Sequence, residues 1–281
     1  MVPVLTISIV LYKTPAEQLR QCIYSLRRFK GLLHLYLIDN SPTDFLRLEC
    51  PLNMSHEYIH LPTNPGFGSA HNVAIRASKS LGSLYHLVLN ADVSFKFDVL
   101  SPMLEYLDAH PEVGQIMPKV LNPDGSIQRL CKLVPTPMNL ILRRLLFKKL
   151  KWASDRRFEM HDSGYNKIMF VPYLSGCFML LRQEALDNIG LFDERYFMYP
   201  EDIDLTRRMA ERYETIFFPD VIVTHEHGAA SYKSLQMLLI HLLNIIKYFN
   251  KWGWCYDPMR IKLNTKALDQ FSTCRVEVKE K

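Results

Sequence analysis

Residues that could do chemistry gather at a few points of this 281-residue chain, and the first is a carboxylate at the end of an apolar segment. Asp92 ends the stretch YHLVLNAD, residues 85–92, whose earlier residues are typical of a buried strand. A carboxylate there can line a binding site, but an Asp in this place also forms turns or caps helices. Both interpretations of Asp92 are open from its local sequence.

The densest acidic cluster consists of Glu201, Asp202 and Asp204, directly after Pro200. Proline at the first helical position with acids in the first turn is typical of a helix start, because carboxylates complement the helix dipole. Three carboxylates within four residues, preceded by the aromatic run at 196–199, exceed what a helix cap requires. The cluster is therefore a candidate for chemistry as well as for a helix start.

A third cluster lies in VIVTHEHGAAS, residues 221–231. Val221, Val223, His225 and His227 alternate along the chain, so on a strand all four would share one face. A lone histidine on such a face is commonly a core residue with its hydrogen bonds satisfied. Two histidines and a carboxylate at a strand end are also the side chains of a metal site.

A glycine-bearing loop, NPGFGSAHN at residues 64–72, leads into a predicted helix. It has neither the Gly-Lys-Ser/Thr ending of a P-loop nor the spacing of a dinucleotide-binding fingerprint, so both of these are excluded. A turn before a helix N-terminus either faces a phosphate or simply connects two elements.

The elements that must position these residues follow from the periodicity of the chain. Short segments rich in β-forming residues, at 6–12, 34–40, 57–62 and 85–92, are interspersed with helical patterns such as residues 15–29. This alternation predicts an α/β fold with a mostly parallel sheet covered by helices. Ligands bind beyond the carboxyl ends of such strands. The polar strand ends are therefore expected to converge on one crevice: Tyr12-Lys13, Asp39-Asn40 and Asn90-Ala91-Asp92.

The rest of the chain is less regular. Residues 113–128 predict a strand, a Pro-Asp-Gly turn and another strand, and residues 171–186 a strand entering a helix. The pattern between 131 and 167 loosens into a basic sequence that we interpret as a flexible insertion. Residues from 234 onward predict an amphipathic helix. We therefore expect a catalytic domain at 1–232 and a C-terminal helical extension at 233–281.

Composition excludes several classes of protein. Hydrophobic residues make up 48% and charged residues 22%, which is ordinary for a soluble globular protein. The six cysteines show no metal-binding spacing, which argues against a zinc finger and indicates reduced thiols in the cytoplasm. The N-terminus has no pattern of a secretion signal, and no apolar segment is long and unbroken enough to predict a transmembrane helix.

Taken in order, the motifs resemble those of a known family. They are ISIVLYK, LIDNSPTD, NPGFGSAHN, LVLNADV, YLSGCFMLLRQEALDNIGLFDERYFMYPEDIDLTRRM and HEHGAAS. This series resembles the family-two inverting glycosyltransferases of the GT-A fold, and within them the bacterial rhamnosyltransferase-like enzymes of cell-surface polysaccharide synthesis. The resemblance covers about residues 6–231, and the block GLFDERYFMYPEDIDL is its most specific part.

The resemblance implies a metal site for the donor's diphosphate. Asp92 matches the metal-binding member of an Asp-x-Asp-like motif, in which Asn90 replaces the first Asp. His225 matches the position that completes the ligands of the metal, which would be Mg²⁺ or Mn²⁺. The role of His227 beside it is left open.

The resemblance also implies the contacts to the rest of the nucleotide-sugar. Asp39 matches the residue that hydrogen-bonds the pyrimidine ring, and Tyr12 lies where the first strand meets the nucleotide. The glycine-bearing loop adds Asn64, Gly66 and Asn72 to the expected donor-binding residues.

On the acceptor side, the resemblance assigns the acidic cluster. Asp202 matches the catalytic base, which removes the proton of the attacking hydroxyl. Glu201 is expected to orient the acceptor, and Asp204 to serve the first turn of the helix.

The expected function is transfer of a sugar, foremost from dTDP-L-rhamnose, to a glycan or polyprenyl-linked glycan, with a UDP-hexose as the alternative donor. A sugar nucleotidyltransferase would show a glycine-rich basic sequence after the first strand, which IVLYKTPAEQL lacks. A non-catalytic nucleotide-sugar-binding protein could dispense with Asp202. A nucleic-acid partner is not expected, because only one basic run favours it and no recognised motif does.

That basic run, at residues 143–151, and the amphipathic helix from Leu235 also suggest a place in the cell. Cations attract anionic lipids, and an amphipathic helix can lie in a membrane surface. The enzyme is expected to be cytoplasmic, with attachment to the inner face of the cytoplasmic membrane and packing of the helix on the catalytic domain as two open alternatives.

Overall fold

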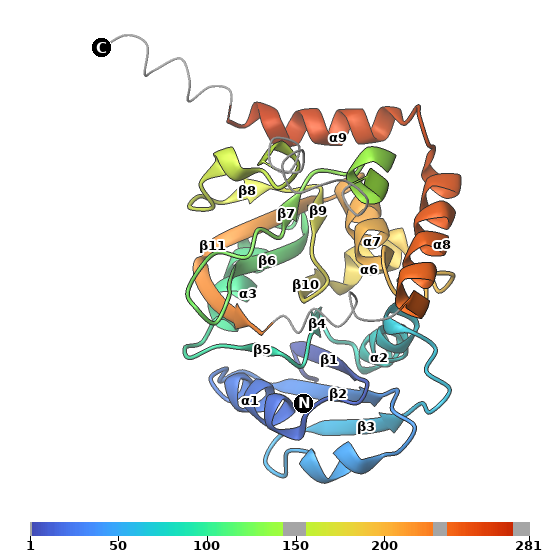
Figure 1. Cartoon of the computed structure of the whole chain (residues 1–281). Helices are drawn as coiled ribbons and strands as arrows, with labels where there is room; N and C mark the ends of the chain where they lie inside the picture. The colour runs from blue at the N-terminus through green and yellow to red at the C-terminus, as the bar shows by residue number, and fades with distance from the viewer. Residues whose placement is uncertain (1, 143–155, 227–234, 272–281) are drawn as a thin grey trace.

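The computed structural model describes residues 2–142, 156–226 and 235–271 (Figure 1). Within these residues a nine-stranded sheet has the strand order β3-β2-β1-β4-β10-β6-β11-β5, and β8 also pairs with β11. A separate small ladder joins β7 to β9. The strands are β1 Leu5–Leu11, β2 Leu33–Asp39, β3 His56–His60, β4 Tyr85–Leu89, β5 Val93–Ser94, β6 Val113–Leu121, β7 Cys131–Lys132, β8 Met169–Phe170, β9 Tyr173–Leu174, β10 Phe178–Arg182 and β11 Glu214–His225.

Helices connect and cover these strands. They are α1 Ala16–Leu26, α2 Phe67–Leu81, α3 Leu100–Ala109, α6 Gln183–Ile189, α7 Glu201–Ala210, α8 Leu235–Trp252 and α9 Pro258–Asp269, with shorter turns at η1 Phe45–Glu49, η2 Met138–Leu142 and η3 His161–Ser163. Gly82 ends α2 in the left-handed conformation, which glycine adopts without steric cost.

The predicted mostly parallel sheet is confirmed. β1 lies between β2 and β4 and pairs in parallel with both, β2 pairs in parallel with β3, and β6 with β11. β10 runs antiparallel between β4 and β6. The strand expected after the 122–125 turn is reduced to a single bridge, between Leu121 and Ile127.

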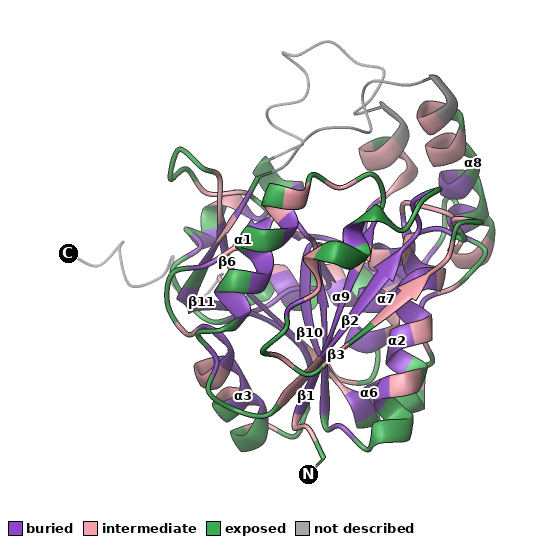
Figure 2. Ribbon diagram, turned by 90° about the horizontal axis from the view of Figure 1, so that it is seen from below, coloured by how far each residue is buried: buried purple, intermediate pink, exposed green. Residues whose placement is uncertain are grey.

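Helices cover both faces of the sheet, with α1 and α3 on one side and α2 and α6 on the other (Figure 2). Successive residues of a strand point to opposite faces. On β10, Phe178 and Leu180 therefore join the core under α1 and α3, whereas Met179 and Leu181 join the core under α2, α6 and α7. Burial on both faces explains why these strands are apolar almost without interruption.

The segment at 131–167, interpreted from sequence as a flexible insertion, is packed over its described flanks. Cys131, Leu133, Phe158, Met160 and Tyr165 are buried in one hydrophobic cluster. Tyr165 donates a hydrogen bond to the carbonyl of Cys131 (3.0 Å), which ties the two flanks together. The prediction is therefore wrong for these flanks, because scattered apolar residues there meet only in the folded chain. The basic run at 143–151 lies outside the described residues.

The C-terminal helices pack against the rest of the chain. α8 places Ile245, Tyr248 and Phe249 in a cluster with Tyr196 and Ile203. α9 contributes to the cluster that also holds the described flanks of 131–167. The domain boundary predicted at 232–233 falls outside the described residues. Among the helices that are described, none is both long and apolar enough to cross a membrane.

Candidate active site

The carboxyl ends of β1 and β2 meet as the sequence predicts. Leu11 is in register with Asp39, and the N–H of Asn40 donates to the Leu11 carbonyl (2.8 Å). The N–H of Lys13 donates to Ser41 Oγ (2.8 Å). A cavity of about 380 Å³ opens at this edge, lined by Lys13, Thr14, Ser41, Pro42, Thr43, Phe45 and Leu46. A larger cavity, about 720 Å³, lies between α1 and the 48–53 segment and is lined by no predicted site residue.

Asp39 lies fully buried beneath this edge. Its Oδ1 accepts a hydrogen bond from the N–H of Ser41 (2.8 Å), and its Oδ2 accepts one from the hydroxyl of Tyr58. Burial, together with that bond to Asp39, raises the pKa of Tyr58 far above its ordinary value. Tyr12, at the end of β1, is half-exposed. Its predicted contact with the nucleotide, and that of Asp39 with the pyrimidine, stay predictions.

Asp92 and His225 come together where β5 meets the end of β11. β5 pairs with the end of β11, so that Val93 lies opposite His225, and the N–H of Glu226 donates to the Asp92 carbonyl (2.9 Å). His225 Nε2 lies 3.1 Å from Asp92 Oδ1. Two residues that are 133 positions apart in the chain are thus fixed side by side by a two-residue strand.

Gln128 sets the orientation of the His225 ring. His225 Nδ1 lies 2.8 Å from Gln128 Oε1, and Gln128 Nε2 donates to the His225 carbonyl (2.7 Å). An amide oxygen only accepts hydrogen bonds, so Nδ1 carries a proton, and Nε2 is the ring nitrogen that faces Asp92. A second partner on the other ring nitrogen is typical of metal-binding histidines.

The donor set of Asp92 and His225 fits a divalent cation shared with a substrate. Asp92 Oδ1 is buried and accepts no hydrogen bond. Over the described ranges, no three Asp, Glu, His or Cys side chains come together as a metal cage. Mg²⁺ is commonly held by one or two protein ligands together with substrate phosphates, which matches a pair of this kind. Asn90 is anchored through its backbone N–H to the Cys177 carbonyl (2.9 Å), and His227 lies outside the described residues.

Asp202 lies in the first turn of α7. Its Oδ2 accepts from the N–H of Gly176 (3.0 Å) and from the Tyr173 hydroxyl (3.4 Å), and its Oδ1 from the N–H of Ile203 (2.8 Å). Burial raises its pKa above the ordinary value of an aspartate. A raised pKa brings a carboxylate closer to the range in which it works as a general base.

The Gly176-Cys177 segment links the two carboxylates. A Cβ on Gly176 would lie 3.2 Å from Asp202 Cβ, so glycine permits this close approach. Burial raises the pKa of the Cys177 thiol to about 12, and the negative charges of Asp92 and Asp202 act in the same direction. The thiol is thus neutral.

Glu201 is placed differently from the expectation. Its side chain is buried, and its Oε2 has no hydrogen-bond partner. Burial, followed by the charge of Asp202, raises its pKa to about 8, so the carboxyl is mostly neutral at pH 7. The predicted contact of Glu201 with the acceptor is not supported, because the first turn of α7 directs this carboxyl inward.

The loop at 64–72 docks on the chain that leads into α7. The N–H of Phe67 donates to the Phe197 carbonyl (3.0 Å). Gly66 has φ of 97°, and a Cβ there would overlap the same carbonyl oxygen. Asn64 Oδ1 accepts from Asn40 Nδ2 (3.2 Å), which ties the loop to the end of β2. The loop therefore connects the end of β2 with the segment that leads into α7.

Asn72 is buried one turn further along α2. Its Nδ2 donates to the Phe192 carbonyl and to Glu194 Oε1 (both 2.9 Å), and its Oδ1 accepts from the N–H of Phe192 (3.0 Å). The expected donor contact of Asn72 is not supported, because these protein partners occupy both ends of its amide.

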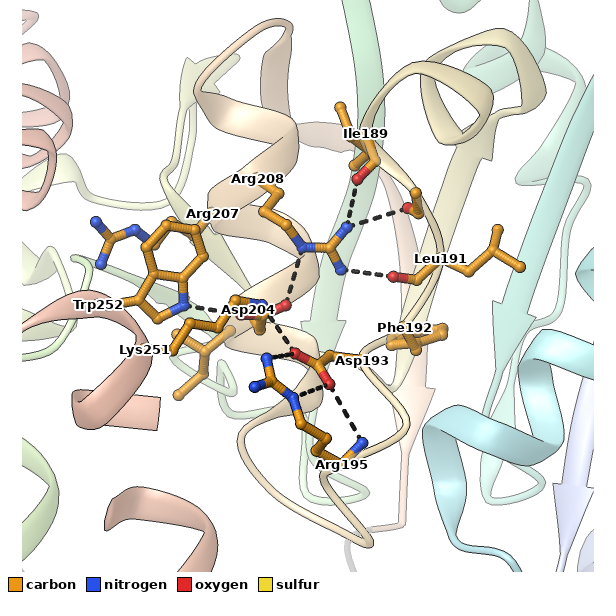
Figure 3. Close-up of polar contacts among 12 residues, drawn as sticks. Ile189, Leu191, Phe192, Asp193, Arg195, Asp204, Arg207, Arg208, Lys251 and Trp252 are labelled. Atoms are coloured by element: carbon orange, nitrogen blue, oxygen red, sulfur yellow. Dashed lines mark hydrogen bonds and ion pairs between the residues drawn. The ribbon is translucent and has the colours of Figure 1, made fainter. Parts of the chain in front are cut away.

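Asp204 has a role that the sequence did not reveal (Figure 3). Expected to serve the first turn of α7, it is fully buried and accepts from Lys251 Nζ (2.6 Å), Trp252 Nε1 (2.8 Å) and Arg208 Nε (2.9 Å). Lys251 also reaches Asp193 Oδ2 (2.9 Å). Only the spacing of Asp204 and Arg208, four residues apart on one helix, could have indicated part of this cluster.

A second buried contact holds α7 to the C-terminal helices. Arg207 donates through both terminal nitrogens to the two oxygens of Asp257 (2.7 Å each), and both side chains are about 2% exposed. The guanidinium also lies 4.0 Å from the ring centre of Trp252. Asp257 additionally accepts from the N–H of Arg260 (2.9 Å) and so caps α9. The helix that begins with the acidic cluster, α7, is thereby fixed to α8 and α9.

The chain matches the family model described as glycosyl transferase family 2 over residues 6–190. It therefore belongs to that family: it is a glycosyltransferase of the GT-A fold.

Curated relatives are similar over much of the chain. The N-acetylglucosaminyl-diphospho-decaprenol L-rhamnosyltransferase of Mycobacterium tuberculosis is 27% identical over 292 residues, which cover 92% of this chain and 89% of the relative. Rhamnosyltransferase WbbL of Escherichia coli strain K12 is 27% identical over 183 residues, covering 61% of this chain and 64% of the relative.

Among solved structures, GalNAc-T7 with UDP, GalNAc and Mn²⁺ superimposes with a TM-score of 0.63 at 16% identity. The match covers 89% of this chain and 48% of GalNAc-T7, so this chain spans about half of that protein's length. At this identity the likeness shows the fold alone.

Proposed function

We propose that this glycosyltransferase moves L-rhamnose from a dTDP-linked donor to a hydroxyl of a diphospho-lipid-linked sugar, with inversion at the anomeric carbon. The observation that carries the proposal is the presence of two carboxylates in different surroundings: Asp92 lies beside His225, and Asp202, in the first turn of α7, accepts a hydrogen bond from the N–H of Gly176. The rhamnosyltransferase names of two curated relatives support the donor sugar, and one of them supports the acceptor class.

Asp92 and His225 would hold a divalent cation, Mg²⁺ or Mn²⁺, together with the donor's diphosphate. Such an ion, when bound, stabilises the negative charge on the leaving diphosphate. Gln128 keeps the His225 ring in the orientation in which Nε2 faces Asp92. The main-chain bond from Glu226 to Asp92 keeps this loop against β11.

Asp202 would accept the proton of the acceptor hydroxyl. At the same time the hydroxyl oxygen forms a bond to the anomeric carbon of the donor sugar, and the bond from that carbon to the diphosphate breaks. The N–H of Gly176 and the hydroxyl of Tyr173 hold Asp202 Oδ2 in place. A single displacement from the face opposite the leaving group inverts the anomeric centre and needs no covalent enzyme intermediate.

The donor is tested by a panel of nucleotides. Thermal shifts with dTDP, UDP and GDP, each with and without Mn²⁺, are followed by transfer assays with the corresponding sugars. We expect the largest metal-dependent shift with dTDP and transfer from dTDP-L-rhamnose. Transfer from a UDP-hexose in its place would correct the donor within the same mechanism, whereas preference for a purine nucleotide would overturn the proposed donor site.

We further propose that the enzyme works at an anionic membrane surface. α8 packs through Ile245, Tyr248 and Phe249, while Leu239, Leu243 and Ile246 are exposed on another side of the helix. An exposed apolar row of this kind can enter a membrane interface. Packing of α8 on the rest of the chain and contact of α8 with a membrane are thus compatible, because they involve different faces of the helix.

Co-sedimentation with anionic vesicles tests this attachment. The variant Leu239→Gln/Leu243→Gln is expected to sediment less, and neutralising Arg143, Arg144, Lys148 and Lys149 should remove the salt-dependent part of binding. Wild-type enzyme that stays in the supernatant would refute the attachment, and binding that survives neutralisation would refute its electrostatic component.

A further inference from the structure

A lysine, Lys132, is linked to the proposed base through Tyr173. In the β7–β9 ladder Lys132 pairs with Tyr173, and Lys132 Nζ lies 5.5 Å from the centre of the Tyr173 ring. The hydroxyl of the same tyrosine donates to Asp202 Oδ2. Cys131, the preceding residue, is fully buried, so strand alternation turns Lys132 to the opposite face, where it is half-buried. The ammonium of Lys132, the ring of Tyr173 and the carboxylate of Asp202 are therefore successive neighbours.

This position belongs to the acceptor rather than to the donor. In the proposed function Asp202 acts on the acceptor hydroxyl, whereas Asp92 and His225 hold the donor's diphosphate. Lys132 is linked through Tyr173 to Asp202. In a diphospho-lipid-linked sugar the phosphates are attached to the ring that carries the attacking hydroxyl, so they enter the crevice close to the base. A lysine ammonium is a common point-charge ligand of phosphate.

We propose that Lys132 binds the diphosphate of the acceptor and so makes the enzyme selective for sugars carried on a diphospho-lipid. The inference rests on the proposed function, because only an acceptor of that class brings a diphosphate close to the base. Burial raises the pKa of Asp202, and the positive charge of Lys132 opposes this effect in part. An opposing effect of this kind is expected of a cation close to the carboxylate. Tuning of the base alone is the competing explanation, and it would act on every acceptor alike.

Two acceptors separate these explanations. One is N-acetylglucosamine on a short-chain polyprenyl diphosphate, and the other is an alkyl β-N-acetylglucosaminide without phosphate. For Lys132→Ala we expect KM for the diphosphate acceptor to rise about tenfold or more, because the variant loses one charge-assisted hydrogen bond to the acceptor. At a pH above the acid limb, activity on the alkyl acceptor and KM for the donor should stay close to wild type. The acid limb itself should move to higher pH by the same amount with both acceptors, because the positive charge that lowers the pKa of Asp202 is gone. Lys132→Arg should recover most of the affinity.

The control variant is Lys79→Ala, which removes one positive charge from the last turn of α2, where Lys79 pairs with Asp187 (3.0 Å). It should change neither acceptor's KM. An equal loss on both acceptors in Lys132→Ala, or a shifted acid limb with unchanged KM, would overturn the proposal in favour of base tuning. A rise in donor KM would assign Lys132 to the donor's diphosphate and also overturn it. Wild-type enzyme that transfers sugar to neither acceptor would refute the proposed function itself, and this inference with it.

Discussion

Replacing Asp257 with asparagine removes one charge from the buried ion pair that joins α7 to the start of α9. Asparagine keeps the size of the side chain and an oxygen that can still cap α9 through the N–H of Arg260. The guanidinium of Arg207, about 2% exposed, loses its bidentate partner. The substitution therefore tests the charge and spares the cap.

The expected cost follows from burial. Removing one partner of a buried pair costs about 3–5 kcal/mol, because the remaining charge is left without compensation. Glu211 Oε1, 3.4 Å from Arg207 Nε, stays in place and compensates in part. We therefore expect the lower end, a loss of about 3 kcal/mol in the free energy of unfolding, which is a large share of the stability of an ordinary domain.

Urea unfolding of Asp257→Asn measures this loss, with Asp44→Asn as the control. Asp44 pairs with Arg47 (3.2 Å), but both side chains are 55% exposed, so its replacement should cost less than about 1 kcal/mol. Equal losses in the two variants would refute the argument that burial makes the Arg207 pair a main anchor of α7.

Three further predictions concern the residues around the base. Burial raises the pKa of Glu201 to about 8, so this carboxyl holds its proton in the folded chain at pH values where it has lost it in the unfolded chain. The wild-type free energy of unfolding therefore falls as the pH rises from 5 to 8. Glu201→Gln removes this loss, so its free energy of unfolding relative to wild type should be higher at pH 8 than at pH 5 by a few kcal/mol. A difference that does not vary with pH would show that Glu201 is not held neutral. Gly66→Ala should cost roughly 2 kcal/mol more than Gly125→Ala, because both residues have positive φ but only Gly66 faces a carbonyl at close range; equal costs would contradict the contact with Phe197. Finally, kcat/KM should fall on acidification at a pH above the ordinary pKa of an aspartate, about 3.9, because the base must be ionised and burial raises its pKa; a profile flat to pH 4 would exclude Asp202 as that base.

The sequence predicted the first half of the sheet closely. The segments expected at 6–12, 34–40, 57–62 and 85–92 correspond to β1, β2, β3 and β4, because parallel strands buried on both faces leave apolar runs that are easy to detect. The antiparallel insertion of β10 between β4 and β6 was not predicted. The local sequence of a strand does not determine which other strands it pairs with in the sheet.

The candidate site was predicted unevenly for the same reason. The ends of β1 and β2 are brought together because parallel strands end at one edge, and the resemblance paired Asp92 with His225. Glu201 and Asn72 were assigned contacts that burial does not support, since the residue type does not reveal which way a helical side chain turns. The partners of Asp204 are 47 and 48 positions away on α8, so its place in the core depends on packing that no motif encodes.

The most direct test of the account is a comparison of donor affinity and turnover in Asp202→Asn and Asp92→Asn. If Asp202 is the general base, Asp202→Asn should lower turnover by roughly 10²-fold or more and leave metal-dependent donor binding unchanged. Asp92→Asn should instead weaken that binding itself, because it removes a proposed ligand of the metal. An Asp202→Asn enzyme that transfers sugar at nearly the wild-type rate would contradict the central claim.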